Sequence, residues 1–170
     1  FIIVFSFVFS MQIIAQDNKE KSIIEIALEG FKFRSIGPAF MSGRIADIAI
    51  DSTNENVWYV AVGSGGLWKT TNSGTTWTPL TDKESFYSTG CVTIDPHNNE
   101  KIWLGTGENV GGRHVGIGHG LFVSNDGGKT WENSGLKKSE HISKIIVHPK
   151  DPNTIWVAVQ GPLWSPDGER

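Results

Sequence analysis

Two carboxylates, Asp47 and Glu108, are the side chains of this sequence that we single out as candidates for catalysis. Hydrolysis of a glycosidic bond uses two carboxyl groups about 5–10 Å apart, one as the acid and the other as base or nucleophile. The two residues are distant in the sequence, so only the fold can bring them together. This pattern alone does not identify a catalytic residue, and the alternative is that the second carboxylate comes from a blade outside this sequence.

Other side chains favour ligand binding over catalysis. Arginines can supply a cationic cluster, and a tryptophan in a loop suits stacking on a sugar ring or an apolar ligand. His114 and His119 are possible metal ligands, but two histidines without a patterned third ligand do not define a site. We therefore predict no metal and no cofactor. The candidates for ligand binding are Arg34, Arg44, Asp47, Arg113, His114 and Trp164.

A similar octamer occurs twice, at 70–77 and 124–131, and it indicates which elements position these residues. A short Asp or Asn side chain in it accepts hydrogen bonds from nearby backbone N–H groups, and Gly supplies a positive φ. The octamer therefore predicts a turn between two strands, with a structural role. Its members are Thr70, Asn72, Gly74, Thr76 and Trp77, and again Ser124, Asp126, Gly128, Thr130 and Trp131.

The chain repeats at a similar spacing. Trp77 and Trp131 are 54 residues apart, and the predicted strand ends Ile50, Ile94 and Val147 are spaced by 44 and then 53 residues. A period of about 40–50 residues with four short strands per unit is typical of β-propeller blades. We predict an all-β propeller of four-stranded antiparallel blades, with about two and a half blades present as a fragment of a larger propeller. The predicted blades are 44–87, 88–140 and 141–170, the last incomplete.

Comparison of the units with one another separates structural positions from the others. Trp58, Trp103 and Trp156 recur on the second strand of each unit, so we predict that they pack between blades. The first turn of each unit holds a predicted turn residue, namely Asp51, Asp95 and His148. The predicted strands are 45–50, 57–62, 67–70, 89–94, 102–104, 121–123, 142–147 and 155–159, with a turn at 95–101.

Asp47 does not recur, because Cys91 and Lys144 take its place in the next units. The start of the innermost strand borders the channel of a propeller, so this position and the loops 105–120 and 160–170 are predicted to share the ligand face. The alternative is structural, with Asp47 as the buried partner of Arg34 or Arg44. Cys91 is predicted to be a small buried hydrophobic residue.

Composition excludes some classes of function. The net charge is −3 with no basic run, whereas nucleic-acid binding needs clustered Lys and Arg. The apolar stretch 1–15 resembles a secretory signal peptide without its basic start, and it is shorter than the about 20 residues of a membrane span. We predict an exported protein, periplasmic, cell-surface or secreted, with no membrane span after cleavage near Gln16. Residues 16–30 are predicted to be a lead-in with a short helix.

Three further segments, 33–38, 41–49 and 65–70, together with the octamers, resemble exported bacterial β-propellers with BNR (Asp-box) repeats. These propellers form a sortilin/Vps10-like group that is usually labelled glycosyl hydrolase. The resemblance covers nearly all of 31–170 and implies a propeller fold with the octamers away from the ligand face. It is much less specific for activity. A catalytic Asp of xyloglucanase-type propellers would stand at Gly63, and the arginine motif that begins sialidases is matched only loosely at 33–38.

Three hypotheses for function follow. The first is a propeller that binds an extracytoplasmic peptide, protein or carbohydrate on its channel face, and we favour it. The second is a glycoside hydrolase, xyloglucanase-like or sialidase-like, that uses two carboxylates. The third is a structural surface protein. A close pair of carboxylates at the channel mouth would favour the enzyme, and an aromatic-lined surface without such a pair would favour binding.

Overall fold

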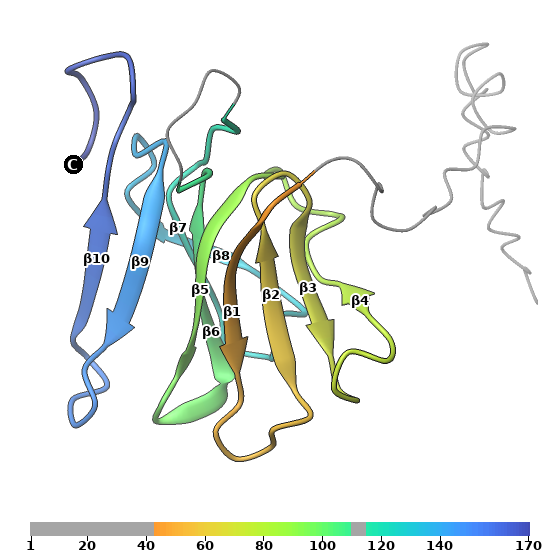
Figure 1. Cartoon of the computed structure of the whole chain (residues 1–170). Helices are drawn as coiled ribbons and strands as arrows, with labels where there is room; N and C mark the ends of the chain where they lie inside the picture. Colours follow the sequence, from red (N-terminus) through yellow and green to blue (C-terminus); the bar gives the residue numbers. More distant parts are fainter. Residues whose placement is uncertain (1–42, 110–114) are drawn as a thin grey trace, which may run out of the picture. The chain divides into compact units, whose positions relative to one another are not determined.

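Figure 1 shows the computed structural model of the chain, which describes residues 43–109 and 115–170. These residues form strands, turns and loops, and they contain no helix that is long and apolar enough to cross a membrane. The predicted signal peptide 1–15, the predicted helix within 16–30, and Arg34, Arg113 and His114 lie outside the described residues.

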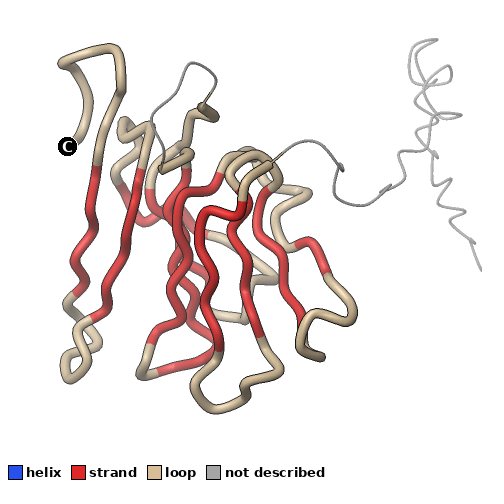
Figure 2. Tube along the Cα trace, in the orientation of Figure 1, coloured by secondary structure: helices blue, strands red, loops and turns tan. Residues whose placement is uncertain are grey.

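The strands form three antiparallel sheets, which we call blades 1, 2 and 3. Blade 1 contains, in this order, β1 (Ile45–Ile50), β2 (Trp58–Val62), β3 (Gly66–Thr70) and β4 (Thr78–Pro79). Blade 2 contains β5 (Thr89–Asp95), β6 (Asn98–Thr106), β7 (Leu121–Ser124) and β8 (Glu132–Gly135). Blade 3 contains β9 (Ile142–Val147) and β10 (Ile155–Val159). Figure 2 shows the strands running alongside one another, with the loops gathered at their two ends.

Most predicted strands are confirmed to within one residue, because short alternating segments bounded by turn residues determine them locally. The predicted turn 95–101 is wrong in length. β6 already begins at Asn98, which pairs with Asp95 across a turn of two residues. Within this turn the backbone N–H of His97 donates to Asp95 Oδ1 at 2.9 Å. The ladder therefore continues where the sequence predicted a loop.

The core lies between neighbouring blades, and blade 2 contributes both of its faces to it. We call the face that looks toward the preceding blade the leading face, and the opposite one the trailing face. The first core packs the trailing face of blade 1, with Tyr59 and Leu67, against the leading face of blade 2, with Ile102 and Leu104. The second core joins blades 2 and 3; its buried members are Cys91, Trp103, Leu121, Ile142, Ile145 and Val147.

The register of the ladders corrects the prediction that three tryptophans are equivalent. Ile50 pairs with Trp58, whereas the equivalent strand end Ile94 pairs with Ile102. The counterpart of Trp103 in blade 1 is therefore Tyr59, and Trp58 lies on the leading face. A shift of one residue in a strand reverses the face of the side chain. Trp103 is buried between blades as predicted.

Trp156 has the same ladder position as Trp103, but its packing differs. Its side chain is 52% exposed on the trailing face of blade 3, because no other described residues cover that face. Trp156 contacts the ring of His148 instead, with 5.4 Å between the ring centroids. The described residues include no blade that could cover this face, so the packing of Trp156 between blades stays a prediction.

Each octamer forms the predicted turn between the third and fourth strands of its blade. In the second octamer, Ser124 Oγ accepts the N–H of Gly128 at 2.8 Å, and Asp126 accepts the hydroxyl of Thr130 at 2.6 Å and its N–H at 3.0 Å. These bonds, led by the Thr130 hydroxyl, hold the pKa of the Asp126 carboxyl below its ordinary value. Asn72 accepts the equivalent N–H bond in the first octamer, at 2.9 Å.

The second octamer also joins blade 2 to blade 1. The carbonyl oxygen of Gly127 accepts hydrogen bonds at 3.3 Å from both Tyr59 Oη and Lys69 Nζ, which come from the trailing face of blade 1. Lys69 Nζ also lies 4.9 Å from the centroid of the Tyr59 ring. The octamer turn therefore contributes contacts between blades as well as the local turn, which agrees with a structural role.

In the first turn of each blade, the side chain at the first position accepts a hydrogen bond from a backbone N–H. Asp51 Oδ1 accepts the N–H of Thr53 at 2.8 Å, as Asp95 does in blade 2. In blade 3, His148 Nδ1 accepts the N–H groups of Lys150 at 3.1 Å and Asp151 at 2.9 Å. An imidazole nitrogen thus replaces the carboxylate oxygen as the acceptor of this turn.

We expect His148→Ala to lower the free energy of unfolding by about 1 kcal/mol, because two backbone donors lose their acceptor. His148→Asp restores the acceptor used in the other blades and should lose less than half as much. Urea unfolding of both variants and of the parent chain checks this. Equal losses for alanine and aspartate would show that the ring packing against Trp156, and not the turn, determines the effect.

Candidate functional site

The predicted ligand face corresponds to one end of the sheets. β1, β5 and β9 begin at this end, and the turn after β2, the loop after β6 and the segment after β10 lie there too (Figure 1). We call it the loop end; its described segments are 43–45, 63–65, 87–88, 107–109, 115–120 and 160–170. Both octamer turns lie at the opposite end, where β3 and β7 finish.

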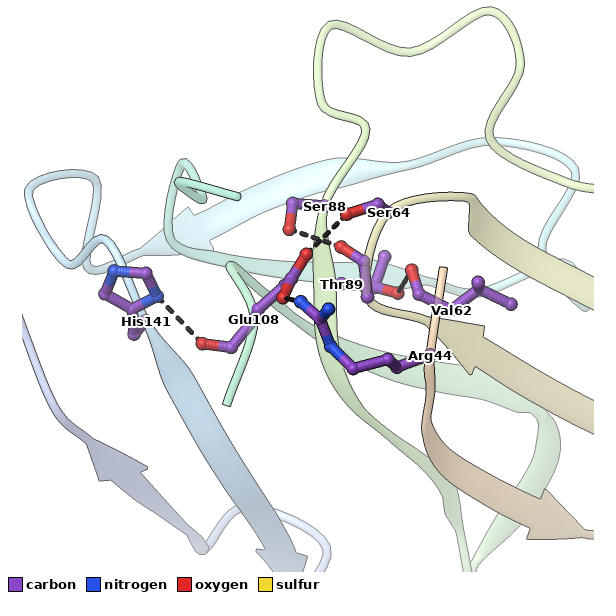
Figure 3. A network of polar contacts seen from close by, with 8 residues as sticks. Arg44, Val62, Ser64, Ser88, Thr89, Glu108 and His141 are labelled. Carbon is purple, nitrogen blue, oxygen red and sulfur yellow. Dashed lines mark hydrogen bonds and ion pairs between the residues drawn. The ribbon is translucent and has the colours of Figure 1, made fainter. Parts of the chain in front are cut away.

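Glu108 is the centre of a polar network at the loop end, drawn in Figure 3. Its side chain is 1% exposed, and its carboxylate accepts hydrogen bonds from the Arg44 guanidinium and the Ser64 hydroxyl. The backbone N–H of Glu108 donates to Gly116 O at 3.0 Å, so Gly116 lies beside Glu108. A buried carboxylate is tolerated when a cation and a hydrogen-bond donor satisfy it. The structure therefore brings together Arg44, a predicted ligand-binding residue, and Glu108, a predicted catalytic residue.

Backbone and hydroxyl groups from all three blades meet around this carboxylate. Ser88 Oγ donates to Gly63 O at 2.6 Å, and Gly107 N–H donates to Ser88 O at 2.9 Å. His141, at the start of blade 3, donates from Nδ1 to the carbonyl oxygen of Glu108 at 2.8 Å. The Glu108 network thus links the first strands of the three blades (Figure 3).

His141 is fully buried, and burial lowers its pKa below the ordinary value for histidine. The neutral form is therefore favoured in the folded state, while the unfolded chain takes up a proton near pH 6.5. The resulting stability is complete above pH 6.5 and is lost as pH falls from there toward the folded pKa.

We expect the free energy of unfolding to decrease between pH 7.5 and 5, by at most about 1.4 kcal/mol per pH unit for this group. His141→Gln keeps an N–H donor for the Glu108 carbonyl but cannot titrate, so it should flatten this part of the profile. Urea midpoints at several pH values measure the difference. A profile that keeps its full slope in the glutamine variant would assign the dependence to other groups.

Asp47 lies apart from the Glu108 network and has a different cation. Its carboxylate pairs with Lys144 Nζ of blade 3 at 3.1 Å and accepts the N–H of Val92 in blade 2 at 3.2 Å. The suggested pairing of Asp47 with Arg44 is wrong, because Arg44 binds Glu108, and pairing with Arg34 falls outside the described residues. Asp47 thus connects blade 1 to both other blades.

Asp47, Cys91 and Lys144 occupy one ladder position in the three blades, as the comparison of units predicted. They pair with Ala61, Gly105 and Ala158, which are themselves equivalent. Cys91 is fully buried, and burial, with a smaller effect of the nearby Asp47 carboxylate, raises the pKa of Cys91 to about 12. The prediction that Cys91 is a buried hydrophobic residue is confirmed.

Large apolar side chains are exposed at the loop end. Ile45 at the start of β1, Tyr87 before β5 and Ile117 before β7 are each more than half exposed, and Trp164 after β10 is 83% exposed. Tyr87 adjoins the Glu108 network, since its carbonyl oxygen accepts the N–H of Gly66 at 2.9 Å and the next residue is Ser88. Trp164 is therefore placed at the predicted face and accessible, as stacking requires.

Sequence reasoning missed Ser64, Ser88 and His141 as members of the Glu108 network. Serines in turns carry no pattern that separates a site from a turn, so nothing in the sequence marked the first two. His141 is a buried hydrogen-bond donor to Glu108 O only because of its place at the start of blade 3, which no local pattern indicates. Among the described residues, no group of three or more His, Cys, Asp or Glu side chains is arranged to hold a metal ion.

Comparison with known proteins supports the fold. No protein-family model matches the chain, and no curated protein matches it in sequence. Among solved structures, it is similar to an ancestral GH74 enzyme (TM-score 0.53, 21% identity, 67% of this chain and 16% of that chain). It is also similar to the GH74 enzyme of Niastella koreensis (TM-score 0.52, 24% identity, 66% of this chain and 16% of that chain).

These likenesses establish the fold as that of a β-propeller, with the described sheets as its blades. The chain spans only 16% of the length of either solved structure. At this level of identity the comparison extends to the fold alone. It does not single out the sortilin/Vps10-like group that the sequence resembles.

Proposed function

We propose that this propeller is an exported, non-catalytic module that binds an extracytoplasmic ligand at the loop end, with a glycan as the first candidate and a peptide or protein as the others. The sequence resemblance to sortilin/Vps10-like BNR-repeat propellers motivates the proposal. One observation carries the proposal. Aromatic and apolar side chains are exposed at the loop end, while the two candidate catalytic carboxylates are already bound to cations of the protein.

The two carboxylates named as catalytic candidates are each bound by a cation. Glu108 is held by Arg44 and Ser64, and Asp47 by Lys144 and the N–H of Val92. Each carboxylate therefore already has partners within the protein, which leaves fewer of its oxygen lone pairs free to meet a substrate. Both carboxylates also contribute to contacts between blades, and this structural role accounts for their presence without catalysis. Binding therefore accounts for the arrangement better than hydrolysis.

The exposed side chains at the loop end suit a ligand with a flat, partly apolar surface. Trp164 and Tyr87 present aromatic rings to solvent, and Ile117 and Ile45 add aliphatic surface. Aromatic rings stack on apolar faces while their polar atoms remain available for hydrogen bonds. The Arg44 side chain is 57% exposed, so guanidinium donors that Glu108 does not use are available to a ligand hydroxyl or carboxylate.

Fluorescence titration of the chain with soluble xyloglucan-derived, cellulose-derived and sialylated oligosaccharides, and with a peptide pool, tests the proposal. Binding should shift the emission of exposed tryptophan to the blue, and Trp164→Ala should weaken affinity by about tenfold, as expected for one lost stacking contact. Trp77→Phe changes a tryptophan at the opposite end and serves as the control. Equal affinities for the two variants would place the ligand elsewhere.

Glycoside hydrolysis is the alternative, and the GH74 enzymes with the same fold make it worth a direct assay. The same oligosaccharides are incubated with the chain and assayed for new reducing ends. Our proposal expects none. Release of reducing ends that Glu108→Gln or Asp47→Asn abolishes would replace the binding proposal with the enzymatic one.

A further inference from the structure

Glu140 and His141 lie between the end of β8 and the start of β9, so they connect blade 2 to blade 3. We call these two residues the entry segment of blade 3. Nδ1 of His141 donates to Glu108 O at 2.8 Å. Glu140 O accepts the N–H of Gly118 at 2.8 Å, and His141 O accepts the N–H of Gln160 at 2.9 Å. The entry segment therefore contacts residues that follow β6, precede β7 and follow β10.

These contacts make the position of Glu108 depend on the entry segment. The main chain of Glu108 is bonded on both sides, since its N–H donates to Gly116 O at 3.0 Å and its carbonyl oxygen accepts from His141. Its carboxylate is bound by Arg44 and Ser64. Loss of the His141 contact frees the peptide bond that follows Glu108. The ion pair with Arg44 is therefore connected to the state of the His141 ring.

A positive charge on His141 is costly at this place. The residue is 1% exposed, and burial lowers its pKa, an effect that the neighbouring Glu140 carboxylate offsets only in part. The Glu108 carboxylate is already bound by Arg44. The charged or titratable side chains on the segments around the ring are Lys138, Glu140, Glu108, His119 and Glu169. Protonation of His141 therefore favours a structure in which the ring reaches water.

We propose that the entry segment is an acid-sensitive contact, which separates from Glu108 and Gly118 when His141 takes up a proton, while the strands of the three blades stay paired. Local opening costs less than unfolding, because the entry segment precedes β9 and lies outside its ladder. Glu108 then loses its fixed place beside Arg44, and acid loosens the loop end. The consequence for a ligand rests on the proposed function, whereas the opening itself does not.

Amide hydrogen exchange tests the opening without a ligand, so its failure is distinct from failure of the proposed function. After correction for the intrinsic effect of pH, the N–H groups of Glu108, Gly118 and Gln160 should lose protection by up to about tenfold per pH unit between pH 6.5 and 5. Their exchange should not respond to low concentrations of urea, because a local opening exposes little surface. Leu104, within β6, reports global unfolding, and its exchange should accelerate with urea.

Two variants assign the effect to one ring. His141→Gln keeps an N–H donor but cannot titrate, so the three amides should keep constant protection over the same range of pH. His119→Gln removes an exposed histidine of the neighbouring segment and should behave like the parent. Constant protection in the parent chain, or equal urea dependence of Gly118 and Leu104, would overturn the proposal, since nothing would then open locally. Both of these outcomes are measured on the parent chain alone and do not depend on the folding of a variant.

Discussion

Gly90→Ala is expected to lower the free energy of unfolding by about 3 kcal/mol, the upper part of the range for adding a methyl group to a packed interior. A Cβ atom at Gly90 would lie 2.2 Å from Ile142 O and 2.3 Å from Gly107 O. Both contacts are backbone atoms, one from blade 3 and one from the segment after β6, so the strain can be relieved only by a shift of the backbone. Urea unfolding measures the loss.

Gly65→Ala is the matched control, since neither glycine has a φ in the left-handed region. Its added Cβ would meet a methyl group of Val62 at 2.8 Å, at the end of a side chain that can shift. We expect a loss of about 1 kcal/mol or less there. If both variants lost the same stability, the close approach of backbone at Gly90 would not be the reason for glycine.

The same packing explains why the loop 105–120 is rich in glycine. A Cβ at Gly107 would lie 1.7 Å from Glu140 O, and one at Gly118 would lie 2.3 Å from Gly107 N. The functional role of this loop stays a prediction; its described part lies against the backbone of Glu140, just before β9, and this close packing accounts for Gly107. Glycine composition reveals the need for small size or unusual φ, but it does not reveal which of these the fold requires.

The strands and octamer turns were predictable because their signals are local. Alternation, turn residues and the repeat at Trp77 and Trp131 all lie within short windows, and they gave β1, β9 and β10 with the observed ends. Trp58 was aligned with Trp103 because both are tryptophan, although their positions relative to the strand ends differ by one residue. Trp58 and Trp103 are 45 residues apart, whereas the strand ends Ile50 and Ile94 are 44 apart, and that difference of one was the available signal.

The ion pairs were not predictable, because they join residues distant in the chain. Arg44 and Glu108 are 64 positions apart, and Asp47 and Lys144 are 97 apart. The comparison of units placed Asp47 and Lys144 at equivalent positions, which the ladder partners confirm. It could not predict that Asp47 of blade 1 pairs with Lys144 of blade 3. Nor could it predict that Arg44, which is closer to Asp47 in the sequence, pairs with Glu108. Each choice depends on the geometry of all three blades.

The Arg44–Glu108 pair should contribute more to stability than any surface ion pair of the described chain. Arg44→Met leaves a carboxylate that is 1% exposed without its cation. Breaking a fully buried pair costs about 3–5 kcal/mol. Because Arg44 itself is 57% exposed, solvent screening reduces the expected loss to about 1–3 kcal/mol. Replacing both partners, as Arg44→Met with Glu108→Gln, removes the uncompensated charge and keeps a polar group for Ser64. The double variant should therefore be more stable than Arg44→Met alone.

A double-mutant cycle measured by urea unfolding isolates this coupling, and the Asp47–Lys144 pair supplies the matched comparison. Asp47 is 17% exposed and Lys144 is 55% exposed, so water can solvate the Asp47 carboxylate when Lys144→Met removes its cation. The coupling energy of Asp47→Asn with Lys144→Met should accordingly stay below about 1 kcal/mol, while that of the Arg44–Glu108 cycle exceeds it. The decisive difference between the two cycles is the burial of the carboxylate, since both cations are half exposed. Equal coupling energies would mean that solvent reaches Glu108 as readily as Asp47, and the network at the loop end would then be open enough for Glu108 to meet a ligand directly.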